Sequence, residues 1–315
     1  FVEFAVNDGG ADPQRIIRAM EGIVRQTWKA NPSTDICFVY TITEALSPPM
    51  LEGKLQRSAS AMEKVADHYG IPSITLGMEV AKLAKAGKLL WRAKLPKTAD
   101  ERAALADQFV FAPDSTHPHE STGHVLYTQA IVRSLPALAI ANATPTPHVI
   151  GPALDAANWE RAKLVPITGA KLSAGLASAD PATDAHAKVW AKRLPVMVKL
   201  TRPGQSLEFR FQGTHCAVYD VVGPAGGKVA VTLDGGKPFV VQRIDAYGTY
   251  PRLSTFIVGT DLAEGVHSVR LELLADPIDK AAVLAKNKNK IDKPERFAPL
   301  EFHPGGLLLL GELVP

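Results

Sequence analysis

The sequence is poor in cysteine: its 315 residues include only Cys37 and Cys216, which lie in separate apolar stretches. Two thiols so far apart, in what we predict to be different domains, argue against a disulfide framework and against a metal site built on a cysteine cluster. We therefore expect both side chains to be buried free thiols.

Charge of one sign and long apolar runs are also lacking. The formal net charge is only +3, and the basic residues are scattered except in "KNKNKIDKPER" at 286–296, which we interpret as a solvated loop. No apolar run reaches the roughly 18 residues that a membrane span needs. The composition therefore argues against nucleic acid and membranes as partners. It favours a globular protein long enough for two domains.

The N-terminal half alternates apolar runs with helical periodicity. "FVEFAV" reads as a buried strand that ends at Asn7, and Asp12-Pro13 is a typical helix start, with a capping residue followed by a first-turn proline. Such alternation predicts a parallel sheet with helices on both faces. The expected elements are strands at 1–6, 36–43 and 69–77, helices at about 13–28, 55–69 and 78–89, and a closing helix capped by Ser121 or Thr122.

The composition changes at about residue 136, where proline and alanine become frequent and the periodicity of apolar residues weakens. Beyond 160, short alternating runs are separated by Gly and Pro turns, and Asp234-Gly235-Gly236 is a hairpin signal. We predict an α/β domain over 1–140, a linker over 141–160, and an antiparallel β-sandwich of jelly-roll type over 161–315.

Asp114 and His117 carry the sharpest chemical signal. A carboxylate three residues before a histidine can orient the imidazole as a general base for a nucleophile, although ordinary polar loop residues show the same spacing by chance. Asn7 ends the first strand and could aim its amide at a developing oxyanion, or it could simply form a turn with Asp8. The carboxyl ends of parallel strands meet at one edge of a sheet, so the two segments could share a site.

"FVEFAVND" and "FAPDSTHPHESTGH" together resemble the SGNH (GDSL-type) hydrolase family. The resemblance covers residues 1 to about 135. It implies a flavodoxin-like α/β fold, with His117 as general base, Asp114 as its partner and Asn7 as an oxyanion-hole donor.

The sequence departs from the family pattern at two places. Ala5 stands where the family has a glycine, which should crowd the loop slightly. The Gly-Asp-Ser block that carries the nucleophile, and the glycine block after it, are absent from the sequence. The resemblance therefore implies that the N-terminal strands and the nucleophilic serine are missing here, and that a segment upstream of Phe1 or a second chain supplies them.

The other histidines and the aromatic residues give weaker signals. His119 and His124 lie near His117, but no second ligand cluster accompanies them, so we expect no metal and no cofactor, and we expect His124 to support the loop. The isolated histidines are interpreted as structural: His68, His148, His186, His215, His267 and His303. Four aromatic residues of the C-terminal half could stack on sugars or form core and interdomain contacts: Trp159, Trp190, Tyr247 and Tyr250.

The C-terminal half resembles the β-sandwich modules attached to carbohydrate-active esterases. With the SGNH resemblance, it implies a serine esterase, secreted or periplasmic, that removes O-acetyl groups from a carbohydrate as acetyl xylan esterases do. Two alternatives stay open. One is a catalytically inactive carbohydrate-binding or scaffold protein, and the other is a lipase or thioesterase of the same fold.

Overall fold

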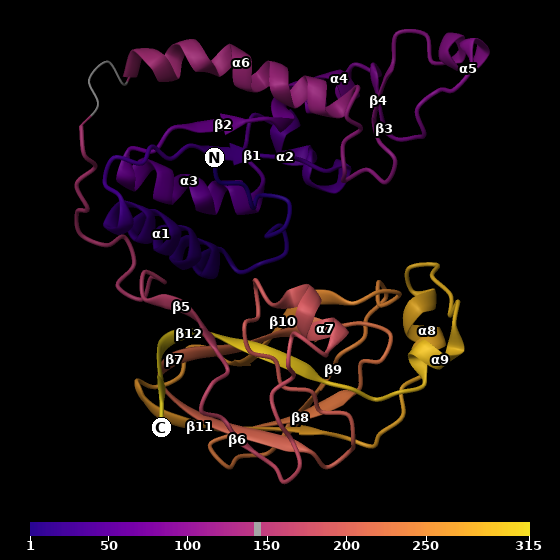
Figure 1. The fold of residues 1–315 in the computed structure, drawn as a ribbon. Helices are drawn as coiled ribbons and strands as arrows, with labels where there is room; N and C mark the ends of the chain where they lie inside the picture. Colours follow the sequence, from indigo (N-terminus) through magenta and orange to yellow (C-terminus); the bar gives the residue numbers. More distant parts are fainter. Residues whose placement is uncertain (142–145) are drawn as a thin grey trace. The chain divides into compact units, whose positions relative to one another are not determined.

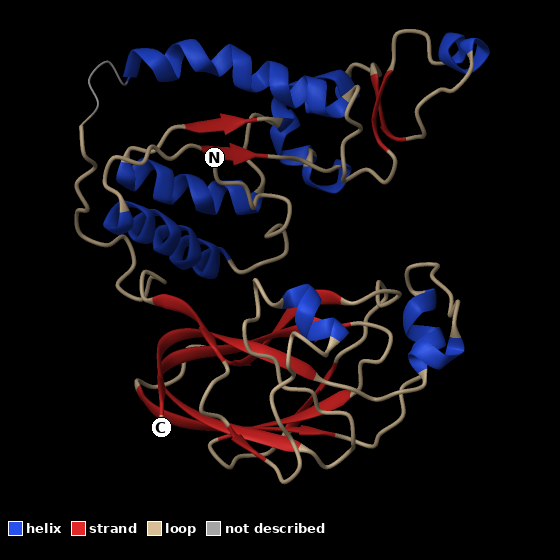
Figure 2. Ribbon diagram, in the orientation of Figure 1, coloured by secondary structure: helices blue, strands red, loops and turns tan. Residues whose placement is uncertain are grey.

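The computed structural model describes residues 1–141 and 146–315, which form two compact units, Phe1–Glu160 and Arg161–Pro315 (Figures 1 and 2). Across these described residues, no helix combines the length and apolarity that crossing a membrane would require.

The first unit alternates helices with short parallel strands. Its elements are α1 (Pro13–Ala30), β1 (Phe38–Tyr40), the 3₁₀ helix η1 (Glu44–Leu46), α2 (Pro48–Leu51), α3 (Arg57–Tyr69), β2 (Ser73–Thr75), α4 (Gly77–Lys85), β3 (Leu89–Arg92), α5 (Ala99–Ala104), β4 (Phe109–Ala112) and α6 (Gly123–Ala141). β1 pairs in parallel with β2, and β3 with β4.

Helices cover both faces of β1 and β2 (Figure 1). Because successive side chains of a strand point to opposite faces, Phe38 and Tyr40 pack with α1 and α3, whereas Val39 packs with α4 and α6. Figure 1 shows α1 and α3 on one side of the strands and α6 on the other. The predicted parallel sheet with helices on both faces is thus confirmed.

The start of α1 follows the predicted capping chemistry. Asp12 accepts the backbone N–H groups of Gln14 and Arg15 at 2.9 and 3.1 Å, and Pro13 occupies the first turn, where its missing N–H costs nothing. The helix then buries one apolar face, which comprises Ile16, Ile17, Met20, Val24 and Trp28.

The prediction of a buried strand over residues 1–6 is wrong in extent. Only Val2 pairs, through a parallel bridge to Phe38, and Phe1 and Phe4 are 75% and 42% exposed. The chain turns away after Phe4 because the N–H of Asp8 donates to the Phe4 carbonyl at 2.8 Å. A turn over 5–10 thus replaces the second half of the expected strand.

Other predicted boundaries shift for local reasons. α3 ends at Tyr69 and is capped by Gly70, whose φ of +63° is left-handed, so β2 begins only at Ser73. The helix expected to reach residue 89 ends at Lys85, and Gly87, with φ of +70°, turns the chain into β3, a strand that was not predicted.

Residues 146–160, where the sequence predicts a linker, are bound to the outer face of α1. The Glu21 carboxylate accepts the N–H groups of Leu154 and Asp155 at 2.6 and 2.8 Å. Arg25 lies 2.5 Å from Glu160. These contacts hold the segment on the surface of the first unit.

The second unit is antiparallel. Its elements are β5 (Ala162–Pro166), β6 (Lys171–Leu172), α7 (Ala185–Trp190), β7 (Ser206–Val222), β8 (Lys228–Leu233), β9 (Phe239–Gln242), β10 (Arg252–Gly259), β11 (Gly265–Leu273), α8 (Lys280–Ala285), α9 (Pro294–Phe297) and β12 (His303–Val314). Asp234 and Gly235 have φ of +51° and +65° between β8 and β9, which confirms the predicted hairpin turn.

The long strand β7 organises this unit. One edge pairs with β11 up to Gly213 and then with β10 from Cys216, while the other edge pairs with β12. β7 therefore belongs to both layers of a sandwich. Gly213 and Gly311 face each other at the bend with φ of +145° and +149°, and a Cβ on either would collide with the opposite backbone.

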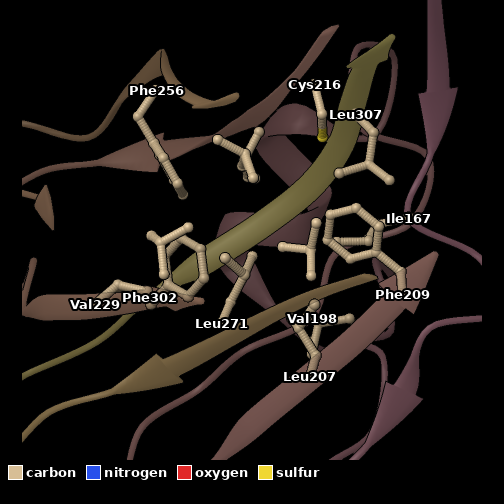
Figure 3. Packing of buried hydrophobic residues seen from close by; sticks show 14 of the residues in the cluster. Ile167, Val198, Leu207, Phe209, Cys216, Val229, Phe256, Leu271, Phe302 and Leu307 are labelled. Atoms are coloured by element: carbon tan, nitrogen blue, oxygen red, sulfur yellow. The ribbon is translucent and has the colours of Figure 1, made fainter. Parts of the chain in front are cut away.

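The core of the sandwich lies between the two layers (Figure 3). Phe211, Phe302 and Leu307 are fully buried there, and each such side chain contributes about 1.5–3 kcal/mol relative to an exposed one. Cys216 lies in the same cluster, as predicted, but Cys37 is only half-buried, so its predicted full burial is wrong. Both thiols are free.

Candidate active site

The loop after β4 holds Asp114 and His117 in contact. Nδ1 of His117 lies 2.7 Å from Oδ2 of Asp114, and Oδ1 accepts the backbone N–H groups of Thr116 and His117 at 3.0 and 2.8 Å. The backbone N–H of His117, followed by its imidazole, holds the pKa of Asp114 well below its usual range. Because an ionised carboxylate can only accept, Nδ1 carries the hydrogen and Nε2 is left as the basic atom.

This arrangement has the chemistry of a base and its orienting group. The His117 side chain is 82% exposed, so its Nε2 is accessible to a reactant. A fixed tautomer with a free Nε2 can take a proton from a hydroxyl and return it to a leaving group.

The end of this loop is fastened to the strands by His119 rather than by His124. The backbone N–H of His119 donates to the Phe111 carbonyl at 2.8 Å, and its Nε2 lies 3.0 Å from the Ala93 carbonyl oxygen. The side chain of His124 is exposed, and its backbone N–H donates to the His119 carbonyl at 3.0 Å. The expected hydroxyl cap at Thr122 instead donates to the Val110 carbonyl at 2.5 Å.

Glycine at 123 is required by the same close packing. A Cβ at Gly123 would collide with Pro118 and with the carbonyl oxygen of Phe111. The loop therefore passes directly from β4 into α6 with little freedom, which fixes the position from which His117 extends.

Asn7 lies in the exposed turn that follows the Val2 bridge. Among the described residues, no hydrogen bond joins it to Asp114 or His117. Burial raises the pKa of the neighbouring Asp8. The structure thus brings Asp114 and His117 together, and the placement of Asn7 in an oxyanion hole is a proposal.

A network at the carboxyl end of β1 connects the segments that carry Asn7 and His117. Oε1 of Glu3 accepts the hydroxyl of Thr41 at 2.6 Å and the N–H of Ala5 at 2.9 Å. One residue further, the N–H of Ile42 donates to the buried hydroxyl of Tyr127 in α6 at 3.1 Å. Both segments are therefore held against the same strand end.

Sequence reasoning did not identify these positioning residues. Glu3 could have been identified from the sequence, because a carboxylate inside an apolar run needs a polar partner when it is buried. The sequence around Tyr127 does not mark it as a positioning residue; it only lies one helical turn after Gly123.

The four aromatic residues do not form a common surface in the second unit. Trp159 belongs to the first unit, where the Arg15 guanidinium lies 5.5 Å from its ring. Trp190 packs against the cluster around Leu194. Tyr247 and Tyr250 are 57% and 56% exposed between β9 and β10.

Comparisons with known proteins give a match in structure and none in sequence. No protein-family model and no curated protein matches the chain. A two-domain esterase (CEX) active on acetylated mannans, co-crystallized with mannopentaose, matches with a TM-score of 0.66 and 14% identity, over 99% of this chain and 71% of that chain. A second structure of a two-domain esterase (CEX) active on acetylated mannans matches with a TM-score of 0.63 and 15% identity, over 95% and 69%.

The likeness confirms the predicted fold class. This chain has the fold of a two-domain carbohydrate esterase, with an α/β unit and an antiparallel β unit in one polypeptide. At this level of identity the match concerns the fold, so the chemistry has to be argued from the residues themselves.

Proposed function

We propose that this protein is a serine esterase of the SGNH type, which removes O-acetyl groups from a carbohydrate. The observation that carries the proposal is the 2.7 Å contact between Nδ1 of His117 and Oδ2 of Asp114 on an exposed loop. The fold supports it, since the most similar structures named above are esterases active on acetylated mannans.

In the proposed mechanism, His117 and Asp114 serve the hydroxyl of a nucleophilic serine, which the SGNH resemblance puts upstream of Phe1 or on a second chain. Nε2 of His117 takes the hydroxyl proton as the serine oxygen attacks the acetyl carbonyl. The Asn7 amide stabilises the oxyanion, and His117 then protonates the leaving sugar oxygen. A water, deprotonated by the same Nε2, attacks the acyl-enzyme and releases acetate and the free serine.

Asp114 contributes by orientation and charge rather than by accepting a proton. Its low pKa keeps the carboxylate ionised, so it stabilises the imidazolium that forms when His117 is protonated. The backbone N–H groups of Thr116 and His117 hold the carboxylate in place for this role.

The test is hydrolysis of 4-nitrophenyl acetate and of acetylated mannan by the full-length protein that carries the proposed serine. His117→Ala should lower kcat by about 10⁶-fold, as loss of a triad histidine does. His124→Ala removes an exposed imidazole seven residues after His117; it is the matched control and should keep wild-type activity. Equal activity of His117→Ala and wild type would overturn the proposal.

The substrate class is tested separately. Preference for acetyl over long-chain esters is expected, and the reverse preference would favour the lipase or thioesterase alternative. A folded protein that binds glycan without turnover would favour the binding or scaffold alternative. Because a polymeric carbohydrate stays outside the cell, we propose that the protein acts in a secreted or periplasmic location.

A further inference from the structure

A second group of chemically competent side chains lies in the other unit. His186 on α7 and the pair Glu301 and His303 at the start of β12 line a cavity of about 200 Å³. The sequence analysis treated both histidines as isolated structural residues because they are far apart along the chain. The structure brings them together through an antiparallel bridge between Leu200 and Phe302 and through packing of α7 on the sheet.

The three side chains converge on one point. Each offers a nitrogen or oxygen atom, and these atoms all lie within 4.8 Å of one another. The ring centroids of His186 and His303 are 5.0 Å apart, and Nε2 of His303 is 3.0 Å from Oε2 of Glu301. A tetrahedral ion with bonds of about 2.0–2.1 Å separates its donor atoms by roughly 3.3 Å, so small side-chain rotations would suffice for coordination.

The cluster contains a buried polar atom without a hydrogen bond. Nδ1 of His186 is buried and has no hydrogen-bond partner among the described residues, while the buried Nε2 of His303 lies 3.0 Å from Oε2 of Glu301. The His303 side chain is only 5% exposed. Leaving a buried polar atom unsatisfied costs about 1–3 kcal/mol, so the His186 nitrogen calls for a ligand.

Charge at the cluster is suited to a cation. Glu301 supplies the carboxylate of the cluster, and its Oε2 faces Nε2 of His303. The nearby cations have other partners: Nζ of Lys199 lies 2.6 Å from Asp184, Arg296 lies 3.5 Å from Asp292, and Nζ of Lys280 donates to three backbone carbonyls at 2.8 Å. Glu301 therefore keeps a negative charge that these cations do not neutralise by direct contact.

We propose that His186, Glu301 and His303 form a binding site for a divalent transition metal, with Zn²⁺ as the ion that fits best. Two imidazoles and one carboxylate form a typical zinc donor set, whereas Ca²⁺ and Mg²⁺ prefer oxygen ligands. The site joins α7 to β12 and leaves a fourth coordination position toward the cavity, where a water or a ligand oxygen would bind. This inference does not depend on the proposed esterase activity.

The test is zinc binding by the full chain, freed of metal with a chelator and titrated with ZnCl₂ against a chromophoric competitor. We expect equimolar binding, together with a rise of the melting temperature that CaCl₂ and MgCl₂ do not produce. His186→Ala should weaken zinc binding at least about 100-fold and abolish the zinc-dependent rise in melting temperature.

Two further variants keep the result interpretable if His186→Ala folds poorly. Glu301→Gln preserves shape and should also weaken zinc binding, with circular dichroism of the metal-free protein unchanged. His124→Ala removes an exposed histidine of the first unit and should bind zinc like wild type. The proposal is overturned if wild type binds no zinc at micromolar concentration, or if His186→Ala and Glu301→Gln bind it as tightly as wild type.

Discussion

The imidazole of His117 donates its Nδ1 hydrogen to Oδ2 of Asp114 across 2.7 Å, while the other oxygen of that carboxylate accepts the backbone N–H of His117. One carboxylate thus fixes both the loop and the ring. The position of the His117 ring therefore depends on the carboxylate of Asp114.

Asp114→Asn should lower kcat for 4-nitrophenyl acetate about 10³- to 10⁴-fold with the fold intact. The amide favours the wrong tautomer of His117, and it carries no charge to stabilise the imidazolium. The control is Asp107→Asn, which alters an exposed carboxylate 3.8 Å from Lys88 and should leave kcat unchanged. Since the pKa of Asp114 is lowered, its carboxylate stays ionised down to strongly acidic pH. Unchanged kcat in Asp114→Asn would contradict this assignment.

Tyr127→Phe should destabilise the first unit by about 1–3 kcal/mol, because it leaves the buried N–H and C=O of Ile42 without the hydroxyl that bonds both, at 3.1 and 3.3 Å. The phenyl ring keeps its edge contact with Phe111, so packing is preserved. Urea denaturation followed by circular dichroism measures the change. Tyr247→Phe, at a 57% exposed position, is the matched control. Equal urea midpoints for the two variants would show that the hydrogen bonds to Ile42 do not stabilise the unit.

The second unit should lose stability as pH rises above neutrality because of His267. Its Nδ1 lies 2.7 Å from the Asp234 carboxylate and its Nε2 lies 2.9 Å from the Ala263 carbonyl oxygen, so both ring nitrogens must donate. The hydrogen bond to Asp234, and then that to Ala263, raises the pKa of His267. Its contribution is therefore fully present below the unfolded pKa of about 6.5 and is lost as pH rises through the higher folded value.

His267→Gln isolates this effect. Between about pH 6 and pH 9, the free energy of unfolding measured with urea should fall more steeply for wild type than for His267→Gln. Subtracting the two profiles removes the contributions of the other titrating groups. Parallel profiles over this range would refute the assignment of a charged His267.

Local sequence determined a large part of this protein. The capping carboxylate of Asp12, Pro13 and the apolar spacing behind them predicted α1, and the Asp234-Gly235 turn predicted a hairpin. The pairing of Asp114 with His117 was also predictable, since three residues in one loop can meet without help from the rest of the chain. Interactions between near neighbours depend on few degrees of freedom, and the residue types alone constrain them.

Tertiary structure decided what depends on distant residues. The first predicted strand is reduced to one bridge, at Val2. The hydroxyl of Tyr127 bonds the backbone at the end of β1, and His119 bonds the loop that carries His117 to the strands. Packing also brought His186 to Glu301 and His303, a cluster with no local pattern because its members come from different elements. Sequence spacing carries information about contacts within a few residues. Contacts between distant segments form only when the apolar faces of helices and strands are buried against one another within a unit.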